Sequence, residues 1–326
     1  MGDLVFFIPP VLETLKKIYP DCEITFVTAW GFKDKNGWGR RNQGGFCIHL
    51  LMTNPHIDHL IHWHDTKLSL DKRICHEDGQ SFPTWNKKHF EEQKKSGRYD
   101  GVYELDFGLT YEDNPIQKMY EAIGLPKETF SDYKLYLTKQ DLDIASEIMR
   151  AAPRPRIVLL ESLSGETTRN WDPGKIPELT KQITATYQVP PIWFGAAYVP
   201  YYQGRPLTLR QNIATLTFCD IGIGVLSGPL HFAVAVGLPT ITLYCDHPLR
   251  RAAPAYFLNK YIKEKSKRHR TLLGPDKKPY QIMKYKTSTN PGFKDWQHPG
   301  RQTTKSCLSV ITVDEIMTVL KDALPV

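Results

Sequence analysis

The sequence predicts an α/β protein with two Rossmann-like domains that face each other across a cleft. Short apolar segments alternate with segments of helical period, the pattern of parallel sheets covered by helices on both faces. The alternation occurs in two runs, separated at residues 150–156 by RAAPRPR. The 326 residues are enough for two hydrophobic cores. We therefore expect domains at residues 1–152 and 153–326.

The elements of the first domain follow from apolar spacing. Residues 10–20 (PVLETLKKIYP) have apolar positions at helical spacing and end at a proline. Further helices are predicted within 114–126 and within 138–153, the second capped by Thr138. Strands are predicted within 22–29 (CEITFVTA), around 60–63 and within 99–107 (YDGVYELDF).

The second domain repeats this alternation. Strands are predicted within 157–161, 190–195, 220–225 and 239–245, and helices within 175–187, 209–219, 227–237 and 312–324. Thr312 is the expected cap of the last helix. The polar, basic stretch from about 250 to 305 has no clear assignment.

Composition limits the function classes. Hydrophobic and charged fractions of 41% and 24% are typical of soluble globular proteins, and no apolar run reaches the ~20 residues that span a bilayer. No signal peptide is recognisable, and six dispersed cysteines without a CxxC pair fit reduced thiols. We expect a cytoplasmic protein. Its formal charge of +7 suits an anionic partner.

The segment CDIGIGVLSGPLHFAVAVGLPTITLYC, residues 219–245, carries the clearest chemical signal. A buried strand at 221–225 leads into a tight turn and a helix that begins at Pro229. Backbone N–H groups of this turn are expected to face outward and bind a phosphate or pyrophosphate; they belong to Ser227, Gly228, Leu230 and His231. A βαβ unit without a ligand is the alternative, and a histidine in the first helical turn favours the anion site.

Within this segment, DIGIGVLSGPLHFAVAVGLPTITLY resembles the signature of glycosyltransferase family 9, the ADP-heptose:lipopolysaccharide heptosyltransferases. Other motifs of that family fall in the same order along most of the chain. They are GDLVFFIPPVLETLKKIYPDCEI, LLMTNPHIDHLIHWHD, GRYDGVYELDF, IVLLESLSGETTRNWDPGKIPELTKQI and CLSVITVDEIMTVLKDAL.

The resemblance implies a GT-B fold, with the donor nucleotide on the C-terminal domain and the acceptor on the N-terminal one. It also implies inversion at the sugar carbon with no metal and no cofactor. Asp3 falls on the family's proposed catalytic base, Ser164 lies in its nucleotide loop, and Arg169 falls where a lysine usually faces the donor phosphates. Such a displacement needs a carboxylate for the acceptor proton and positive groups for the leaving diphosphate.

The predicted function is therefore transfer of a sugar, a heptose by resemblance, from a nucleotide diphosphate to a lipopolysaccharide-core-type or other anionic glycan. Leu226 stands where the family has aspartate, so the donor sugar stays open. The alternative is a non-catalytic or N-terminally truncated family member that binds nucleotide or glycan without turnover. A dinucleotide-dependent dehydrogenase is disfavoured because no GxGxxG follows a first strand.

Basic clusters indicate further contacts. The cluster assigned to the acceptor comprises Lys33, Lys35, Arg40 and Arg41. The run at 260–270 is expected to contact an anionic inner-membrane surface peripherally. The histidines at 56, 59, 62 and 64 alternate over both faces of a predicted strand, so no metal site is expected. The tryptophans are too dispersed for a nucleic-acid-binding surface.

Two readings of the N-terminus place Asp3 differently. In the family register, residues 3–20 form a helix entered at Asp3, and the preceding strand lies upstream of Met1. Otherwise residues 4–8 (LVFFI) serve as a replacement strand and move Asp3 away from the cleft. We favour the first reading, with the first strand of the domain missing from this chain.

Overall fold

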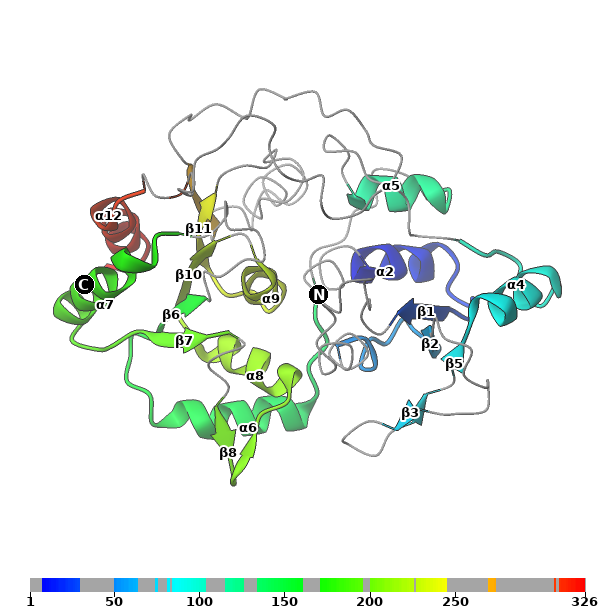
Figure 1. Ribbon diagram of the computed structural model, residues 1–326, viewed down its shortest axis with the longest axis horizontal. Helices are drawn as coiled ribbons and strands as arrows, with labels where there is room; N and C mark the ends of the chain where they lie inside the picture. The colour runs from blue at the N-terminus through cyan, green and yellow to red at the C-terminus, as the bar shows by residue number, and fades with distance from the viewer. Residues whose placement is uncertain are drawn as a thin grey trace.

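The structure is a computed structural model (Figure 1). It describes residues 8–29, 50–63, 74–75, 81–82, 84–103, 115–125, 134–160, 171–195, 200–225, 227–244, 269–273, 308 and 311–325. Within these ranges no helix is long and apolar enough to cross a bilayer.

The N-terminal half contains a parallel sheet in the order β1-β2-β5, formed by β1 (Thr25–Ala29), β2 (His59–Trp63) and β5 (Thr84–Trp85). Helices α2 (Ile8–Ile18) and α5 (Pro115–Ala122) contact each other, and their apolar residues share one core cluster. These elements confirm the predicted strands at 22–29 and 60–63 and the helices near 10–20 and 114–126.

Smaller elements complete this half. Helix α4 (Lys87–Lys95) begins at Asn86, whose side chain accepts a hydrogen bond from the N–H of His89. Strands β3 (Ile74–Cys75) and β4 (Ser81–Phe82) pair antiparallel. Residues 99–103, the described part of the strand predicted at 99–107, form no strand.

Asp58 joins α2 to the sheet. Its Oδ2 accepts hydrogen bonds from Lys16 Nζ and from the N–H of Ile24, both at 2.7 Å. Burial raises the pKa of this carboxyl, but the Ile24 N–H and the Lys16 ammonium outweigh it and lower the pKa below its usual value. The carboxylate thus fixes the end of α2 to the starts of β1 and β2.

The C-terminal half contains a five-stranded parallel sheet in the order β12-β11-β10-β6-β7. Its strands are β6 (Ile157–Leu160), β7 (Ile192–Phe194), β10 (Ile221–Val225), β11 (Thr240–Tyr244) and β12 (His269–Leu273). Numbered along the chain, the order is 2-1-3-4-5, that of a doubly wound sheet.

Helices cover both faces of this sheet, as predicted. Ile157 and Leu159 of β6 share a cluster with α7 (Ile176–Tyr187) and α12 (Val313–Ala323). The alternate residues, Val158 and Leu160, share another with α8 (Leu209–Thr215) and α9 (Gly228–Ala235). Short 3₁₀ segments, η2 (Pro173–Lys175) and η3 (Leu216–Phe218), adjoin α7 and α8.

Threonine capping boxes begin three helices. Thr138 caps α6 (Lys139–Arg150) together with Asp141, Thr208 caps α8 with Gln211, and Thr312 caps α12 with Glu315. The predicted caps Thr138 and Thr312 are confirmed.

Two strand features have weak sequence signals. β12 lies inside the unassigned stretch 250–305 and pairs with β11, Arg270 opposite Ile241. Strands β8 (Tyr201–Tyr202) and β9 (Arg205–Pro206) form an antiparallel hairpin. Neither segment shows the apolar run of a buried strand.

The contacts of α6 bear on the domain boundary. The boundary at 152/153 stays a prediction, but α6 precedes it and packs against α8 and η3, which follow it. Figure 1 shows α6 and α8 side by side under the large sheet. By packing, α6 belongs with the C-terminal half.

Candidate nucleotide-binding site

The candidate site lies where β10 turns into α9. Glycines at 222 and 224 bring β10 close to β6: a Cβ built on Gly224 lies 2.7 Å from Leu160 Cβ and 3.3 Å from Leu160 O. Only glycine fits at that separation. The strand then leads to Ser227, whose extended backbone (φ −154°, ψ 172°) begins α9. The helix begins at Gly228, one residue before the predicted start at Pro229.

One predicted N–H donor is used within the helix. The backbone N–H of His231 donates to the carbonyl of Ser227 at 3.2 Å. Contrary to the prediction, this N–H is therefore not available to a ligand. This bond is the first i to i−4 bond of the helix, which the sequence analysis did not count. Pro229 has no N–H, so the expected donors that remain are Ser227, Gly228 and Leu230.

The side chain of Ser227 is the unusual group at this turn. Serine at a helix N-cap ordinarily accepts a hydrogen bond from the first turn, but Ser227 makes no such cap. Its Oγ is buried and has no hydrogen-bond partner among the described residues. An unsatisfied buried hydroxyl costs about 1–3 kcal/mol. A ligand oxygen bound at the turn would satisfy it.

The topology places a second loop beside this turn. β6 and β10 are adjacent and parallel, with Leu159 opposite Ile223, so the chain leaves both strands at the same edge of the sheet. They are also the first and third strands along the chain, between which the strand order reverses. Ligands of doubly wound sheets bind at such a point, outside the carboxyl ends of the strands.

Ser164 and Arg169 follow β6 in the sequence, but they lie outside the described residues, as does Leu226. The same holds for Asp3 and for the predicted acceptor cluster Lys33, Lys35, Arg40 and Arg41. Of the predicted site, the structure therefore describes the β10–α9 turn. Leu230 is fully buried among the residues beneath the turn, so its side chain serves the core.

The structure shows the surroundings of two of the four histidines, His56 before β2 and His59 at its start. His59 Nε2 lies 3.6 Å from Glu23, and neighbouring Asp58 is held by Lys16 and Ile24. Burial lowers the pKa of His56. In the part of the chain that the structure describes, no three His, Cys, Asp or Glu side chains are grouped as metal ligands.

The fold is α/β with parallel sheets in both halves, and the β10–α9 turn lies at the edge where doubly wound sheets bind ligands. The family model for glycosyltransferase family 9 (heptosyltransferase) matches residues 205–298, which include α8, β10, α9 and β11. This match confirms the resemblance to that family which the sequence motifs indicate. A comparison with curated proteins found no match.

Solved structures similar to this chain agree on the fold. A glycosyltransferase of family 9 from Veillonella parvula DSM 2008 is 15% identical, with 99% of this chain and 94% of that chain covered and a TM-score of 0.58. ADP-heptose lipopolysaccharide heptosyltransferase II of E. coli is 13% identical, with 97% of this chain and 93% of that chain covered and a TM-score of 0.53. The dodecameric iron-containing heptosyltransferase TibC, from enterotoxigenic E. coli H10407, was solved with ADP-D-β-D-heptose. It is 12% identical, with 99% of this chain and 74% of that chain covered and a TM-score of 0.51. The fold is GT-B.

Proposed function

We propose that this protein is an inverting, metal-independent glycosyltransferase. It transfers a sugar, a heptose by resemblance, from a nucleotide diphosphate to an anionic glycolipid acceptor of the lipopolysaccharide-core type. The observation that carries the proposal is the β10–α9 turn. There the buried Ser227 hydroxyl, which has no partner in the described part of the chain, lies at a helix N-terminus and at the reversal point of the sheet. The turn lies inside the matched family region.

The proposed chemistry divides between the halves. Asp3 accepts the proton of the acceptor hydroxyl as its oxygen attacks the anomeric carbon, and the bond from that carbon to the diphosphate breaks. Backbone N–H groups of the turn and the Arg169 guanidinium stabilise the charge of the leaving diphosphate. ADP is the expected nucleotide because TibC is described with ADP-heptose. Lys33, Lys35, Arg40 and Arg41 bind anionic groups of the acceptor.

We also propose a cytoplasmic location with peripheral contact to the inner face of the membrane. The support is the basic run at 260–270, whose last two residues, His269 and Arg270, lie in edge strand β12. Each cation near an anionic membrane surface contributes about 1 kcal/mol to binding.

The donor site is tested by ADP binding in calorimetry. Ser227→Ala removes the unpartnered hydroxyl, and we expect about tenfold weaker ADP binding, because one hydrogen bond contributes about 1–1.5 kcal/mol. Thr180→Ala is the matched control, since its Oγ1 is also buried and unpartnered, but on α7. Equal losses in the two variants, or none in Ser227→Ala, would contradict the assignment of the turn.

Catalysis is tested by transfer from ADP-heptose to a lipopolysaccharide core acceptor. Asp3→Asn is expected to lower turnover by about 10²–10⁴-fold, the usual contribution of a general base, without weakening ADP binding. Equal rates for wild type and variant would remove Asp3 from the mechanism.

The second candidate is a protein that binds nucleotide or glycan without turnover. Leu226 favours it, because a carboxylate of the family signature is replaced by an apolar side chain at the turn. Tight ADP binding with no transfer or hydrolysis of any nucleotide sugar in a panel would support this candidate over the enzyme.

A further inference from the structure

Helix α4 presents a basic surface at the outer end of the N-terminal half, on the side away from α9 (Figure 1). None of its nine residues is buried. Exposed cations lie along the helix and just after it, and we name them the basic face: Lys87, Lys88, Lys94, Lys95 and Arg98. Only two carboxylates accompany them between residues 87 and 98.

The lysines of the basic face lie on one side of α4. Each lysine of the first turn has another lysine seven residues further on, about two helical turns away and therefore on the same side. The opposite side is held by aromatic contacts. The ring of Trp85 in β5 meets His89 at 5.1 Å and Phe90 at 6.5 Å between centroids. These contacts attach α4 to the edge strand and leave the lysines exposed to solvent.

The two carboxylates do not neutralise the basic face. Glu92 lies 3.8 Å from Lys88 Nζ and 3.8 Å from His89 Nδ1, and exposed ion pairs of this kind contribute little. Glu91 is half-buried, whereas all five cations are exposed. Five cations against two carboxylates leave an excess of three positive charges. The surface that solvent meets is therefore cationic.

The stability of α4 accounts for only some of these lysines. Lys94 and Lys95 lie in the last turn, where cations interact favourably with the helix dipole. Lys87 and Lys88 lie in the first turn, where the dipole favours acidic residues and α4 has none. The pair of Lys88 with Glu92 also has the weaker orientation, because its lysine precedes its glutamate. The first-turn lysines thus destabilise the helix, and an anionic partner would offset this.

We propose that the basic face docks on an anionic bilayer surface. Its lysines extend over about 12 Å of helix, a length that many lipid headgroups can match and that exceeds one small anion. Trp85 and Tyr99, which are half-buried beside the helix and 6.3 Å apart between centroids, are residue types enriched at membrane–water interfaces. α4 itself exposes no large apolar side chain, so the attraction is electrostatic and requires anionic lipid.

This inference deepens the peripheral membrane contact of the proposed function and does not use the run at 260–270. β5 pairs with the last two residues of β2, so α4 begins near the carboxyl edge of the N-terminal sheet. The chain leaves β1 at the same edge towards the predicted acceptor cluster at 33–41. Docking through α4 would bring that edge to a membrane that holds a glycolipid acceptor. This consequence rests on the proposed function, whereas lipid binding by α4 does not.

Co-sedimentation with vesicles measures the docking. One set of vesicles contains phosphatidylcholine alone, and the other contains equal parts of phosphatidylcholine and phosphatidylglycerol. The α4 variant replaces four lysines by a residue of similar helix propensity: Lys87→Gln, Lys88→Gln, Lys94→Gln and Lys95→Gln. The matched control removes four exposed cations from the C-terminal half: Lys139→Gln, Lys181→Gln, Arg205→Gln and Lys321→Gln. Both variants lose the same net charge.

We expect the wild-type protein to bind the anionic vesicles and to be released from them by salt, because screening weakens exposed charges. The α4 variant should bind at least about tenfold more weakly, since each lysine near an anionic surface contributes several-fold to the affinity. The control should stay within about threefold of wild type, since its cations lie away from the docking surface.

Equal affinities of wild type and the α4 variant, or equal losses in the two variants, would overturn the docking surface. Lysine-dependent binding to a short RNA duplex without vesicle binding would overturn the choice of lipid. Vesicle binding through α4 by a protein that transfers no sugar would refute the proposed function and leave the docking surface in place.

A measurement on the wild-type protein decides the question if the α4 variant does not fold. Acetic anhydride labels exposed lysines, and mass spectrometry locates the labels. Anionic vesicles should protect Lys87, Lys88 and Lys95 from labelling and leave Lys181 and Lys321 reactive. Equal labelling of the two groups in the presence of vesicles would contradict docking through α4.

Discussion

Replacing Gly224 by alanine is expected to destabilise the C-terminal half by forcing β10 away from β6. The new Cβ would stand 2.7 Å from Leu160 Cβ and 3.3 Å from the Leu160 carbonyl oxygen. Both atoms belong to or adjoin the backbone of the neighbouring strand, so a side-chain rotation cannot relieve the clash. We therefore take the upper end of the usual overpacking cost, about 3 kcal/mol. Alanine restricts the unfolded chain and offsets about 0.4–1 kcal/mol, which leaves about 2 kcal/mol.

Gly222→Ala is the matched comparison on the same strand and the same face. Its Cβ would lie 3.3 Å from Leu160 Cδ1 and from Leu238 Cδ2, and 3.5 Å from Val158 Cγ1. These are ends of side chains that can shift by a few tenths of an ångström. The overpacking cost should then be about 1 kcal/mol and nearly cancel the gain from the unfolded state.

Thermal and urea unfolding measure the difference. A loss of about 2 kcal/mol corresponds to a melting point roughly 4–8 °C lower for Gly224→Ala, with little change for Gly222→Ala. Adding Leu160→Ala should not rescue Gly224→Ala, because Leu160 Cβ remains. The reasoning is refuted if Gly222→Ala costs as much as Gly224→Ala, or if Leu160→Ala restores the latter.

Two further predictions concern pH. Because the pKa of Tyr136 is raised to about 12 in the folded protein, the unfolded chain loses this proton first, and stability falls as pH rises from about 10 towards 12. Tyr136→Phe should lack this part of the fall in urea unfolding between pH 9 and 11, and parallel curves for the two proteins would contradict it. The pKa of Asp58 is lowered, so its contribution is present above about pH 4 and is lost as pH falls further. Asp58→Asn should cost about 1 kcal/mol at pH 7 and progressively less below pH 4 in the same assay, whereas a pH-independent difference would argue against the ion pair with Lys16.

Local patterns predicted most of the elements. The capping boxes at Thr138 and Thr312 consist of residues three apart, and the glycines of IGIGV mark a strand that needs a close neighbour. Both features are complete within a few residues of the chain, so the sequence alone could reveal them. Strand β12 was missed because His269–Leu273 (HRTLL) begins with a histidine and an arginine. Its assignment depends on pairing with β11.

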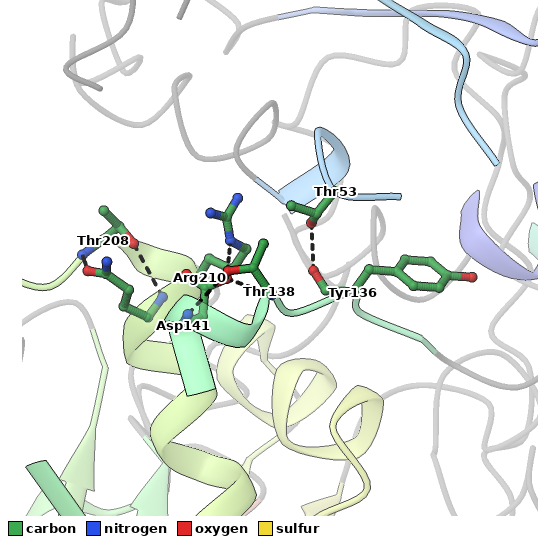
Figure 2. Close-up of polar contacts among 7 residues, drawn as sticks. Thr53, Tyr136, Thr138, Asp141, Thr208 and Arg210 are labelled. Atoms are coloured by element: carbon green, nitrogen blue, oxygen red, sulfur yellow. Dashed lines mark hydrogen bonds and ion pairs between the residues drawn. The ribbon is translucent and has the colours of Figure 1, made fainter. Parts of the chain in front are cut away.

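Two long-range contacts drawn in Figure 2, Arg210 with Asp141 and Thr53 with Tyr136, have no local signal in the sequence. Arg210 and Asp141 are 69 positions apart, and Thr53 and Tyr136 are 83 positions apart. Neither pair is distinguishable in the sequence from ordinary surface side chains. The same holds for the buried hydroxyl of Ser227: the sequence predicted the turn, but the missing partner is a property of the packing around it. Only the assembled fold reveals such groups.

Helix α12 has a consequence for the order in which the chain folds during synthesis. The indole of Trp171 and the ammonium of Lys175 both donate to the carbonyl of Ile311, and the Tyr187 hydroxyl donates to the carbonyl of Leu324. One face of the large sheet therefore stays uncovered over the α12 position until residues 313–323 have left the ribosome. The N-terminal core cluster draws mainly on residues 8–125 and can assemble far earlier. A nascent chain released before α12 would expose Ile241 and Leu243, which makes this stage the one most prone to aggregation.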